Sequence, residues 1–296
     1  MIIVYIMCLL SVISFTLFGV DKHKAVNHRW RISEMSLLLS AVLGGIGGLT
    51  GMLFFRHKTR KWKFRILVPL FAIIDAFVIA FFLQTSFYYH ADETAAAAMQ
   101  SDSPVTVVKT DGGWLFDGPS DDVALIFYPG ARVEETAYAP LLRRLAEEKM
   151  DVCLVKMPFR LAFFGMNKAG KIMAHTDYSR FYIGGHSLGG AMAASYAAGH
   201  ESDFSGLILL ASYPTDETGI DTLLIYGSED EILNVDRFTA SLSLLSGRWE
   251  EAVIDGGNHA GFGNYGSQKG DGKAGISPLE QQEKTIEYIS EFVKAK

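Results

Sequence analysis

Three long apolar segments lie in the first 90 residues, and they constrain the fold more than any other feature of the chain. They cover residues 2–20, 35–55 and 66–89, with Asp75 as the only charged residue among them. A helix of about 20 apolar residues can cross the hydrocarbon core of a bilayer. We therefore predict that residues 1–90 form a transmembrane domain of about three helices. A cleaved signal peptide is the alternative for the first segment, but no Lys or Arg precedes it and no Ala-x-Ala site follows it.

The second apolar segment is rich in glycine, and the third contains an acidic residue. The glycines permit either close helix packing or a re-entrant turn, and the sequence leaves both open. An ionised Asp75 at the centre of a bilayer would be costly, so we expect it to face the other helices or to be protonated. A packing contact and a transport role both remain open for it. The glycines of the second segment are Gly44, Gly45, Gly47, Gly48 and Gly51.

Charge is distributed unevenly along the chain. Residues 1–90 carry ten Lys and Arg against three Asp and Glu, whereas residues 91–296 carry 17 against 30. Four basic residues lie at 22–31 and six at 56–65. Because cytoplasmic loops carry the excess of Lys and Arg, we predict a multi-pass protein of the cell membrane whose C-terminal domain is extracytoplasmic. The basic loops are expected to contact anionic lipid heads of the bilayer, and no nucleic-acid partner is expected.

The basic loops also carry short motifs. These are Asp21-Lys22, Trp30-Arg31-Ile32 and Arg56-His57-Lys58-Thr59. Across residues 21–64 the chain resembles DUF1294, a family of small bacterial membrane proteins of unknown function. The resemblance implies a compact multi-helix membrane module with no known chemistry. His23, His28 and His57 have no carboxylate or Cys beside them at ligand spacing, so we expect solvated loop residues and no metal site.

From residue 104 onward, short apolar runs alternate with helical stretches. This pattern predicts an α/β domain at 104–296, a doubly wound and mostly parallel sheet, after a linker at 91–103. A hairpin is expected within 104–118 about Asp111-Gly112-Gly113. The predicted strands that follow lie at 123–128, 151–156, 180–184, 206–211, 222–226 and 250–254, and the predicted helices at 134–149, 188–199, 235–246 and 278–295.

A serine between glycines follows the strand predicted at 180–184. Gly185-His186-Ser187-Leu188-Gly189 is followed by the small residues of "GAMAASYAAGH", which favour a tightly packed helix. A sharp strand-to-helix turn exposes a serine hydroxyl at the sheet edge, and the flanking glycines remove side chains that would clash there. We therefore interpret Ser187 as a candidate nucleophile. His186 is expected to be a satisfied interior imidazole.

A serine nucleophile needs a base that a third group orients. Asp230 follows the run at 222–226, and His259 follows the run at 250–254. Because the carboxyl ends of parallel strands meet at one edge, we expect Asp230 and His259 to lie beside Ser187. Glu229 and Asp255 lie near the same edge and remain alternatives to Asp230.

Two backbone amides are expected to complete the site. Leu188 N–H follows the serine directly, and Ala131 N–H lies in the turn after the strand at 123–128; both are candidate oxyanion-hole donors. Tyr138, a little further along, could touch a substrate but is more simply a helix-packing tyrosine. No metal and no organic cofactor are expected.

Four motifs in order carry a second resemblance. They are "YPGARVEE", "GGHSLGG", "YGSEDEI" and "GGNHAGFGNYG". Residues 123–295 resemble the α/β-hydrolase superfamily, in a bacterial branch similar to the α/β-hydrolase fold-5 group. The resemblance implies Ser187 as nucleophile, Asp230 as acid and His259 as base. Only "YPTDETGID" separates the runs at 206–211 and 222–226, so no large cap is expected there, and the apolar loop at 157–173 is a candidate cover.

The resulting hypothesis is a membrane-anchored serine hydrolase that cleaves a small-molecule carboxylic ester or a related acyl bond. Amide hydrolysis and acyl transfer would use the same groups. Two other interpretations remain. The domain could be a non-catalytic binding module of the same fold, or the function could lie in the membrane helices.

Overall fold

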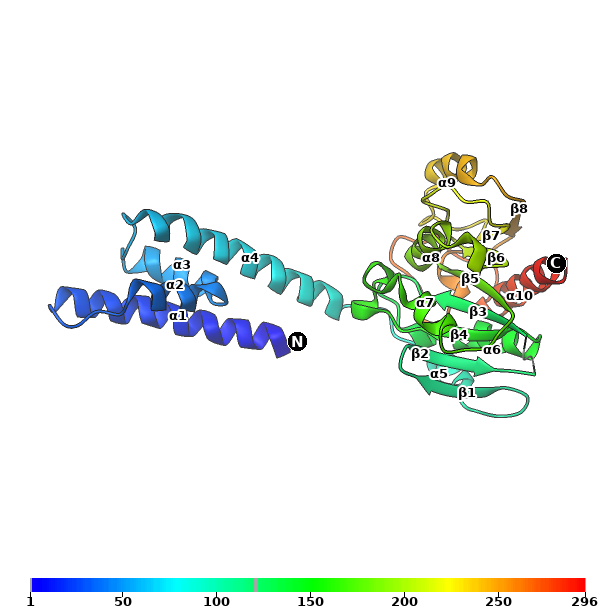
Figure 1. Cartoon of the computed structure of the whole chain (residues 1–296), viewed down its shortest axis with the longest axis horizontal. Coiled ribbons are helices and arrows are strands. Elements are labelled where there is room, and N and C mark those ends of the chain that lie inside the picture. The colour runs from blue at the N-terminus through cyan, green and yellow to red at the C-terminus, as the bar shows by residue number, and fades with distance from the viewer. Residues whose placement is uncertain (1, 120–121, 296) are drawn as a thin grey trace. The chain divides into compact units, whose positions relative to one another are not determined.

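The computed structural model describes residues 2–119 and 122–295 and contains two compact units (Figure 1). Unit 1 ends at Phe87, and unit 2 begins at Tyr88. Unit 1 is helical. Unit 2 contains an eight-stranded sheet with helices on both faces.

Unit 1 contains two long helices and two short ones among its described residues. By length and composition, α1 and α4 are long and apolar enough to cross a membrane. The glycine-rich segment at 35–55 does not form one helix, because the chain breaks at Leu43 and Gly44. The expected set of about three helices is therefore corrected to four. They are α1 (Ile2–Val26), α2 (Glu34–Val42), α3 (Gly45–Phe54) and α4 (Trp62–Ser86).

The helices α2 and α3 form a hairpin whose two ends lie beside the same residue of α1. Before α2, Ile32 N–H donates to Asp21 Oδ1 over 2.8 Å, near the C-terminal end of α1. At the start of α3, Gly47 lies against Ser11, so closely that a Cβ on Gly47 would be 1.7 Å from the Ser11 carbonyl oxygen. After α3, the chain is again beside Asp21. The glycine-rich segment therefore folds back on itself, and both basic loops lie at the same end of unit 1.

The carboxylate of Asp21 joins the two basic loops. It is fully buried and accepts hydrogen bonds from Ile32 N–H and from His57 Nε2, the latter over 2.7 Å. Lys58 Nζ and Arg31 also lie 3.7 Å from it. His57 is therefore buried and paired, which corrects the expectation of a solvated loop residue. Its partner lies 36 residues earlier in the chain, outside the local spacing from which that expectation came.

Asp75 has a structural contact in unit 1. Its Oδ2 accepts the N–H of Gly45 over 2.6 Å. The first N–H groups of a helix have no partner inside the helix, and a carboxylate at this position satisfies one of them. Asp75 therefore caps α3, which supports the packing role among the two that the sequence left open.

Unit 2 follows the predicted α/β pattern. The hairpin of β1 and β2 turns at Asp111 and Gly112, as expected. Its strands are β1 (Thr106–Thr110), β2 (Gly113–Asp117), β3 (Val123–Tyr128), β4 (Asp151–Val155), β5 (Arg180–His186), β6 (Gly206–Leu210), β7 (Thr222–Gly227) and β8 (Trp249–Ile254). Its α-helices are α5 (Glu93–Ala98), α6 (Ala139–Glu147), α7 (Lys168–Met173), α8 (Leu188–Ala198), α9 (Val235–Ser241) and α10 (Pro278–Lys294).

The sheet is mixed but mostly parallel. Its strand order is β1-β2-β4-β3-β5-β6-β7-β8, and every neighbouring pair from β4 to β8 is parallel. The strand β3 is buried throughout, and its side chains alternate between two hydrophobic cores. Leu125 and Phe127 pack with α6 and α10, while Ile126 and Tyr128 pack with α7, α8 and α9. Only residues 211–221 connect β6 to β7, so no large cap is inserted there.

The segment expected to be a linker, 91–103, contains α5 instead. Asp92 caps this helix, because its Oδ1 accepts the N–H of Ala95 over 2.9 Å. Ala95 is fully buried, and Arg143 on α6 donates to the carbonyl oxygen of Ala98 over 3.3 Å. The run of alanines in the expected linker thus belongs to a short helix that packs on α6.

Candidate functional site

The sheet topology brings the predicted site residues to one edge. Ser187 directly follows β5, Asp230 lies three residues after β7, and His259 lies five residues after β8. Ala131 lies three residues after β3, which is the parallel neighbour of β5. All of them therefore follow carboxyl ends of parallel strands, where sheets of this kind place their ligands.

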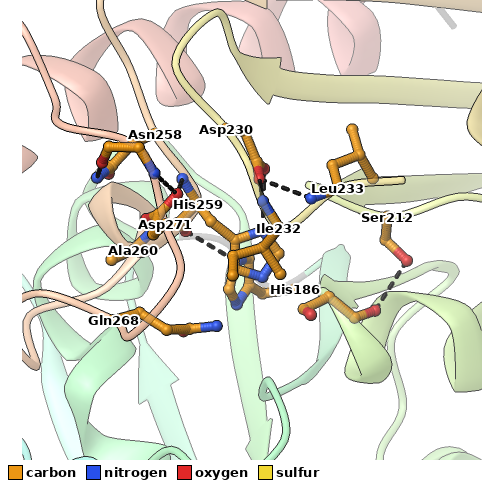
Figure 2. Close-up of polar contacts among 12 residues, drawn as sticks. His186, Ser212, Asp230, Ile232, Leu233, Asn258, His259, Ala260, Gln268 and Asp271 are labelled. Atoms are coloured by element: carbon orange, nitrogen blue, oxygen red, sulfur yellow. Dashed lines mark hydrogen bonds and ion pairs between the residues drawn. The ribbon is translucent and has the colours of Figure 1, made fainter. Parts of the chain in front are cut away.

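Ser187 occupies a strained turn between β5 and α8. Its φ is 54° and its ψ is −125°, a conformation that residues with a side chain seldom adopt. Ser187 N–H donates to Leu210 O over 2.9 Å, and Ser212 Oγ donates to Ser187 O over 2.8 Å. Figure 2 labels Ser212, the donor of the second bond. The turn has the geometry of a nucleophile elbow.

Gly189 allows this turn to pack closely. A Cβ at this position would lie 2.2 Å from the Tyr128 carbonyl oxygen and 2.4 Å from that of Pro129. Both atoms belong to backbone at the end of β3, which cannot move without moving the strand. The helix α8 can therefore begin this close to the end of β3 only with glycine at position 189.

Asp230 and His259 form a buried pair. Asp230 Oδ2 lies 2.9 Å from His259 Nδ1, and the two side chains are 1% and 2% exposed. The other oxygen, Oδ1, accepts the N–H groups of Ile232 and Leu233 over 2.9 and 2.8 Å (Figure 2). Three donors thus fix the carboxylate in one orientation and hold the imidazole by its Nδ1.

The alternatives to Asp230 lie elsewhere. Glu229 is exposed, and its carboxylate accepts a hydrogen bond from the neighbouring Ser228 hydroxyl over 3.0 Å. Asp255 is also exposed. Of the three acidic residues near this edge, the structure brings Asp230 to His259 Nδ1.

The second ring nitrogen of His259 is the one that a serine would need. Nε2 is buried and has no hydrogen-bond partner among residues 2–119 and 122–295, so no bond to Ser187 is formed here. Catalytic hydrogen bonds are often long in the absence of substrate and tighten when it binds. The arrangement leaves this nitrogen without a partner at the sheet edge where Ser187 also lies.

Sequence reasoning missed Asp271, which holds the backbone of the histidine loop. Its carboxylate accepts the N–H of His259 over 3.2 Å and that of Ala260 over 2.8 Å (Figure 2). On α10, Gln281 clamps the same loop, because its amide pairs with both backbone groups of Asn258. Asp271 lies in a glycine-rich stretch, and no local pattern there distinguishes it from a solvated acid.

A buried hydrogen-bond chain connects the turn after β3 with the histidine loop. His186 Nε2 donates to the His259 carbonyl oxygen over 3.0 Å, so Nε2 carries the proton. Burial, and then the nearby His259 ring, lower the pKa of His186 well below its ordinary value, so the ring is neutral and Nδ1 accepts. Tyr138 donates to that Nδ1 over 2.8 Å and accepts Gly130 N–H over 3.1 Å. The expectation of a satisfied interior imidazole at His186 is confirmed.

The neutral state of His186 predicts a pH dependence of stability. Its pKa is lowered in the folded chain, so the unfolded chain binds the extra proton. Stability is therefore full above the ordinary pKa of about 6.5 and falls below it, by at most about 1.4 kcal/mol per pH unit. Thermal unfolding of the full chain in detergent from pH 8 to pH 5 measures this, and His186→Gln should flatten the decline. An identical slope in the variant would contradict this assignment.

The oxyanion donors named from the sequence lie in suitable turns. Leu188 is the first residue of α8, where backbone N–H groups have no partner within the helix. The N–H groups on both sides of Ala131 already have hydrogen-bond acceptors. Gly130 N–H donates to Tyr138 Oη, and Arg132 N–H donates to Arg160 O over 2.9 Å. Within the described residues, no group of three His, Cys, Asp or Glu side chains could hold a metal ion.

Two family models match different parts of the chain. The model of the alpha/beta hydrolase family matches residues 124–283, and that of a family of unknown function, DUF1294, matches residues 11–64. An uncharacterized protein of Bacillus subtilis (strain 168), YsdA, is 43% identical over 83 residues, which are 28% of this chain and 93% of that protein.

Several solved structures are similar at low sequence identity. TT1662 from Thermus thermophilus has 13% identity and a TM-score of 0.48, and the match covers 65% of this chain and 99% of that one. A thermophilic esterase from Thermogutta terrifontis has 14% identity and a TM-score of 0.46, and the match covers 64% of this chain and 92% of that one. Est1E from Butyrivibrio proteoclasticus has 14% identity and a TM-score of 0.48, and the match covers 65% of this chain and 100% of that one.

Proposed function

Because this chain belongs to the alpha/beta hydrolase family, with a DUF1294 region before the hydrolase domain, we propose that it is a membrane-anchored serine hydrolase. It cleaves a carboxylic ester or a related acyl bond through Ser187, His259 and Asp230. One observation carries the proposal. The buried Asp230–His259 pair leaves His259 Nε2 without a partner at the edge where the strained Ser187 turn lies.

The chemistry follows from these groups. Ser187 Oγ attacks the carbonyl carbon of the substrate while its proton passes to His259 Nε2, and Asp230 stabilises the imidazolium that forms. The N–H groups of Leu188 and Ala131 donate to the oxyanion of the tetrahedral intermediate. The bond between the carbonyl carbon and the alcohol oxygen of the ester then breaks, and His259 gives the proton to that leaving oxygen. A water molecule, deprotonated by the same nitrogen, then attacks the acyl carbon. The bond to Ser187 Oγ breaks, and His259 returns the proton to Ser187 as the carboxylic acid leaves.

A fluorophosphonate probe tests the serine directly. Wild-type chain in detergent should be labelled, and Ser187→Ala should not, because the probe reacts only with an activated hydroxyl. Ser202→Ala, an exposed serine outside the site, should label like the wild type. An unlabelled wild type would contradict the proposal and favour a non-catalytic binding module. Labelling together with transfer of the acyl group to an alcohol would identify an acyltransferase.

The path of unit 1 supports an extracytoplasmic hydrolase domain. With α2 and α3 as a re-entrant hairpin, both basic loops belong to the same side of the membrane, and they hold ten Lys and Arg at 22–31 and 56–65. The positive-inside rule assigns that side to the cytoplasm. A chain that continues beyond the other end of α4 is then outside.

Protease added to spheroplasts tests this orientation. It should degrade unit 2 while a cytoplasmic marker protein stays intact. Residues 22–65 should be protected until the cells are lysed. Protection of unit 2 before lysis would reverse the orientation without affecting the proposal for Ser187.

A further inference from the structure

The loop after β4 differs in charge from the rest of unit 2. Residues 156–176 contain four basic residues and no Asp or Glu, whereas residues 91–296 as a whole carry 17 Lys and Arg against 30 Asp and Glu. The basic residues are Lys156, Arg160, Lys168 and Lys171. An acidic domain therefore presents one wholly basic segment, at the carboxyl end of a strand.

The same loop exposes aromatic side chains. Phe159, Phe163 and Phe164 are 43%, 69% and 48% exposed, and their rings contact one another. Phe159 and Arg160 both have positive φ, 55° and 56°, so the backbone holds a strained conformation here. Clustered exposed aromatic rings beside Lys and Arg are typical of surfaces that bind the interface of an anionic membrane.

A cleft of about 300 Å³ lies beside Phe159, one of these three aromatic residues. Lys156, Arg160 and Lys168 line it, and Glu135 is the single acid among its lining residues. Glu135 is paired with Lys156 over 3.4 Å. Three basic side chains and one acidic one line the cleft, so positive charge is in excess here. Burial, and then the positive charges of Lys171 and Lys156, lower the pKa of Lys168. An anionic group in the cleft would relieve this repulsion.

The loop is tethered close to the end of the proposed membrane helix. The Arg160 guanidinium lies 3.4 Å from the centre of the Tyr88 ring. Only Phe87 separates Tyr88 from Ser86, the last residue of α4, and successive Cα atoms are about 3.8 Å apart. The covalent chain therefore keeps Arg160 within a short reach of the residue where α4 ends.

We propose that residues 156–171 form a docking surface for the anionic phospholipid bilayer that α4 crosses. Phe159, Phe163 and Phe164 insert among the acyl chains, and the basic side chains of the cleft contact lipid phosphates. The substrate of Ser187 is then an ester carried by a lipid of that membrane. This last part rests on the proposed function, whereas the docking surface does not.

The docking surface is connected to the proposed oxyanion hole. Arg160 O accepts the N–H of Arg132, the residue after Ala131. The short 3-10 helix η3 (Ala162–Gly165) packs on α8, whose first residue is Leu188. The docking surface therefore contacts both segments that carry the proposed donors, the turn after β3 and α8.

Insertion can be measured without catalysis. In the full chain with Cys8→Ser, the remaining Cys153 is buried, so Phe163→Cys can be labelled with the environment-sensitive fluorophore NBD. In phosphatidylglycerol nanodiscs, we expect blue-shifted emission that spin-labelled lipid quenches. The same label at Leu279→Cys, an exposed position on α10, should be neither shifted nor quenched. Equal behaviour at both positions would overturn the docking surface, and so would insertion that is unchanged in phosphatidylcholine discs.

Activity tests the substrate class. For the triple variant Phe159→Ser, Phe163→Ser and Phe164→Ser, we expect the ratio of phosphatidylglycerol hydrolysis to hydrolysis of a short soluble ester to fall at least about tenfold. The paired change Lys156→Gln and Lys168→Gln should lower the same ratio. The matched variant Val235→Ser and Leu279→Ser, which removes exposed apolar side chains on α9 and α10, should not. An unchanged ratio in the triple variant would overturn the proposal.

Failure of the proposed function gives a different result. A wild type that the fluorophosphonate does not label would reject the hydrolase, while NBD insertion at position 163 would still support the docking surface. A wild type that is labelled but hydrolyses no phospholipid would reject the lipid substrate and leave the hydrolase intact.

Discussion

Replacing Asp230 by Asn is expected to lower kcat for ester hydrolysis about 10⁴-fold, the size of the effect of the same change in serine proteases. The contacts of Asp230 explain why. Its Oδ1 accepts two backbone N–H groups, from Ile232 and Leu233, and an Asn carbonyl oxygen would keep both. The amide NH₂ must then face His259 Nδ1. That nitrogen would accept, the proton would lie on Nε2, and Nε2 could no longer take the proton of Ser187.

The neighbouring acids provide matched controls. Glu229→Gln and Asp255→Asn remove carboxylates at the same edge, but both residues are exposed. We expect each to change kcat by less than about threefold, because exposed charges interact weakly with their surroundings. Steady-state kinetics on a soluble ester measures all three variants. A loss in Glu229→Gln as large as that in Asp230→Asn would mean that the wrong carboxylate has been assigned.

Local patterns predicted the features of the sheet. The central strands of unit 2 are short apolar runs bounded by turn residues. This pattern is typical of strands that are covered on both faces, and β3 is buried at every position. The serine turn was also local, because a strand, two glycines and a run of small residues lie in one stretch at 180–198. The order of strands then brings Asp230 and His259 to the same edge, which a general rule for parallel sheets anticipates.

Contacts between distant residues could not be predicted in this way. His57 was expected in solvent because its partner, Asp21, lies 36 residues earlier in the chain, on α1. Asp271 and Tyr138 are common residue types in unremarkable positions, and their roles follow only from the loops that the fold brings beside them. The run of alanines in α5 has no apolar periodicity, and its helix is stabilised by the capping residue Asp92 and by packing on α6.

The break in the glycine-rich segment has a similar origin. Composition alone allows one spanning helix or a re-entrant pair. The carboxylate of Asp75, 30 residues later, accepts the N–H of Gly45 and so stabilises a helix that begins inside the segment. The choice between the two forms thus depends on a residue that the segment itself does not contain.

A methyl group added at Gly189 is expected to have the second largest effect. The Gly189→Ala Cβ would lie 2.2 Å from the Tyr128 carbonyl oxygen and 2.4 Å from that of Pro129, so α8 and the end of β3 must move apart. The proposed donors are Leu188, the first residue of α8, and Ala131, three residues after the end of β3. Because misplacement by about 1 Å can cost about 10²-fold in rate, we expect a loss of kcat of that order. Overpacking should also lower stability by about 1–3 kcal/mol.

Gly199→Ala separates this steric effect from the general effect of glycine. Gly199 directly follows α8 with φ −85°, and the nearest atom that an added Cβ would meet is 3.6 Å away. Alanine at such a site usually stabilises a protein by about 0.4–1 kcal/mol, because it restricts the unfolded chain. We therefore expect the unfolding temperature and kcat to fall in Gly189→Ala. In Gly199→Ala the unfolding temperature should rise or stay unchanged, and kcat should stay at the wild-type value. Wild-type kcat in Gly189→Ala would mean that α8 and β3 tolerate a wider separation, and the two backbone donors would lose their assigned role.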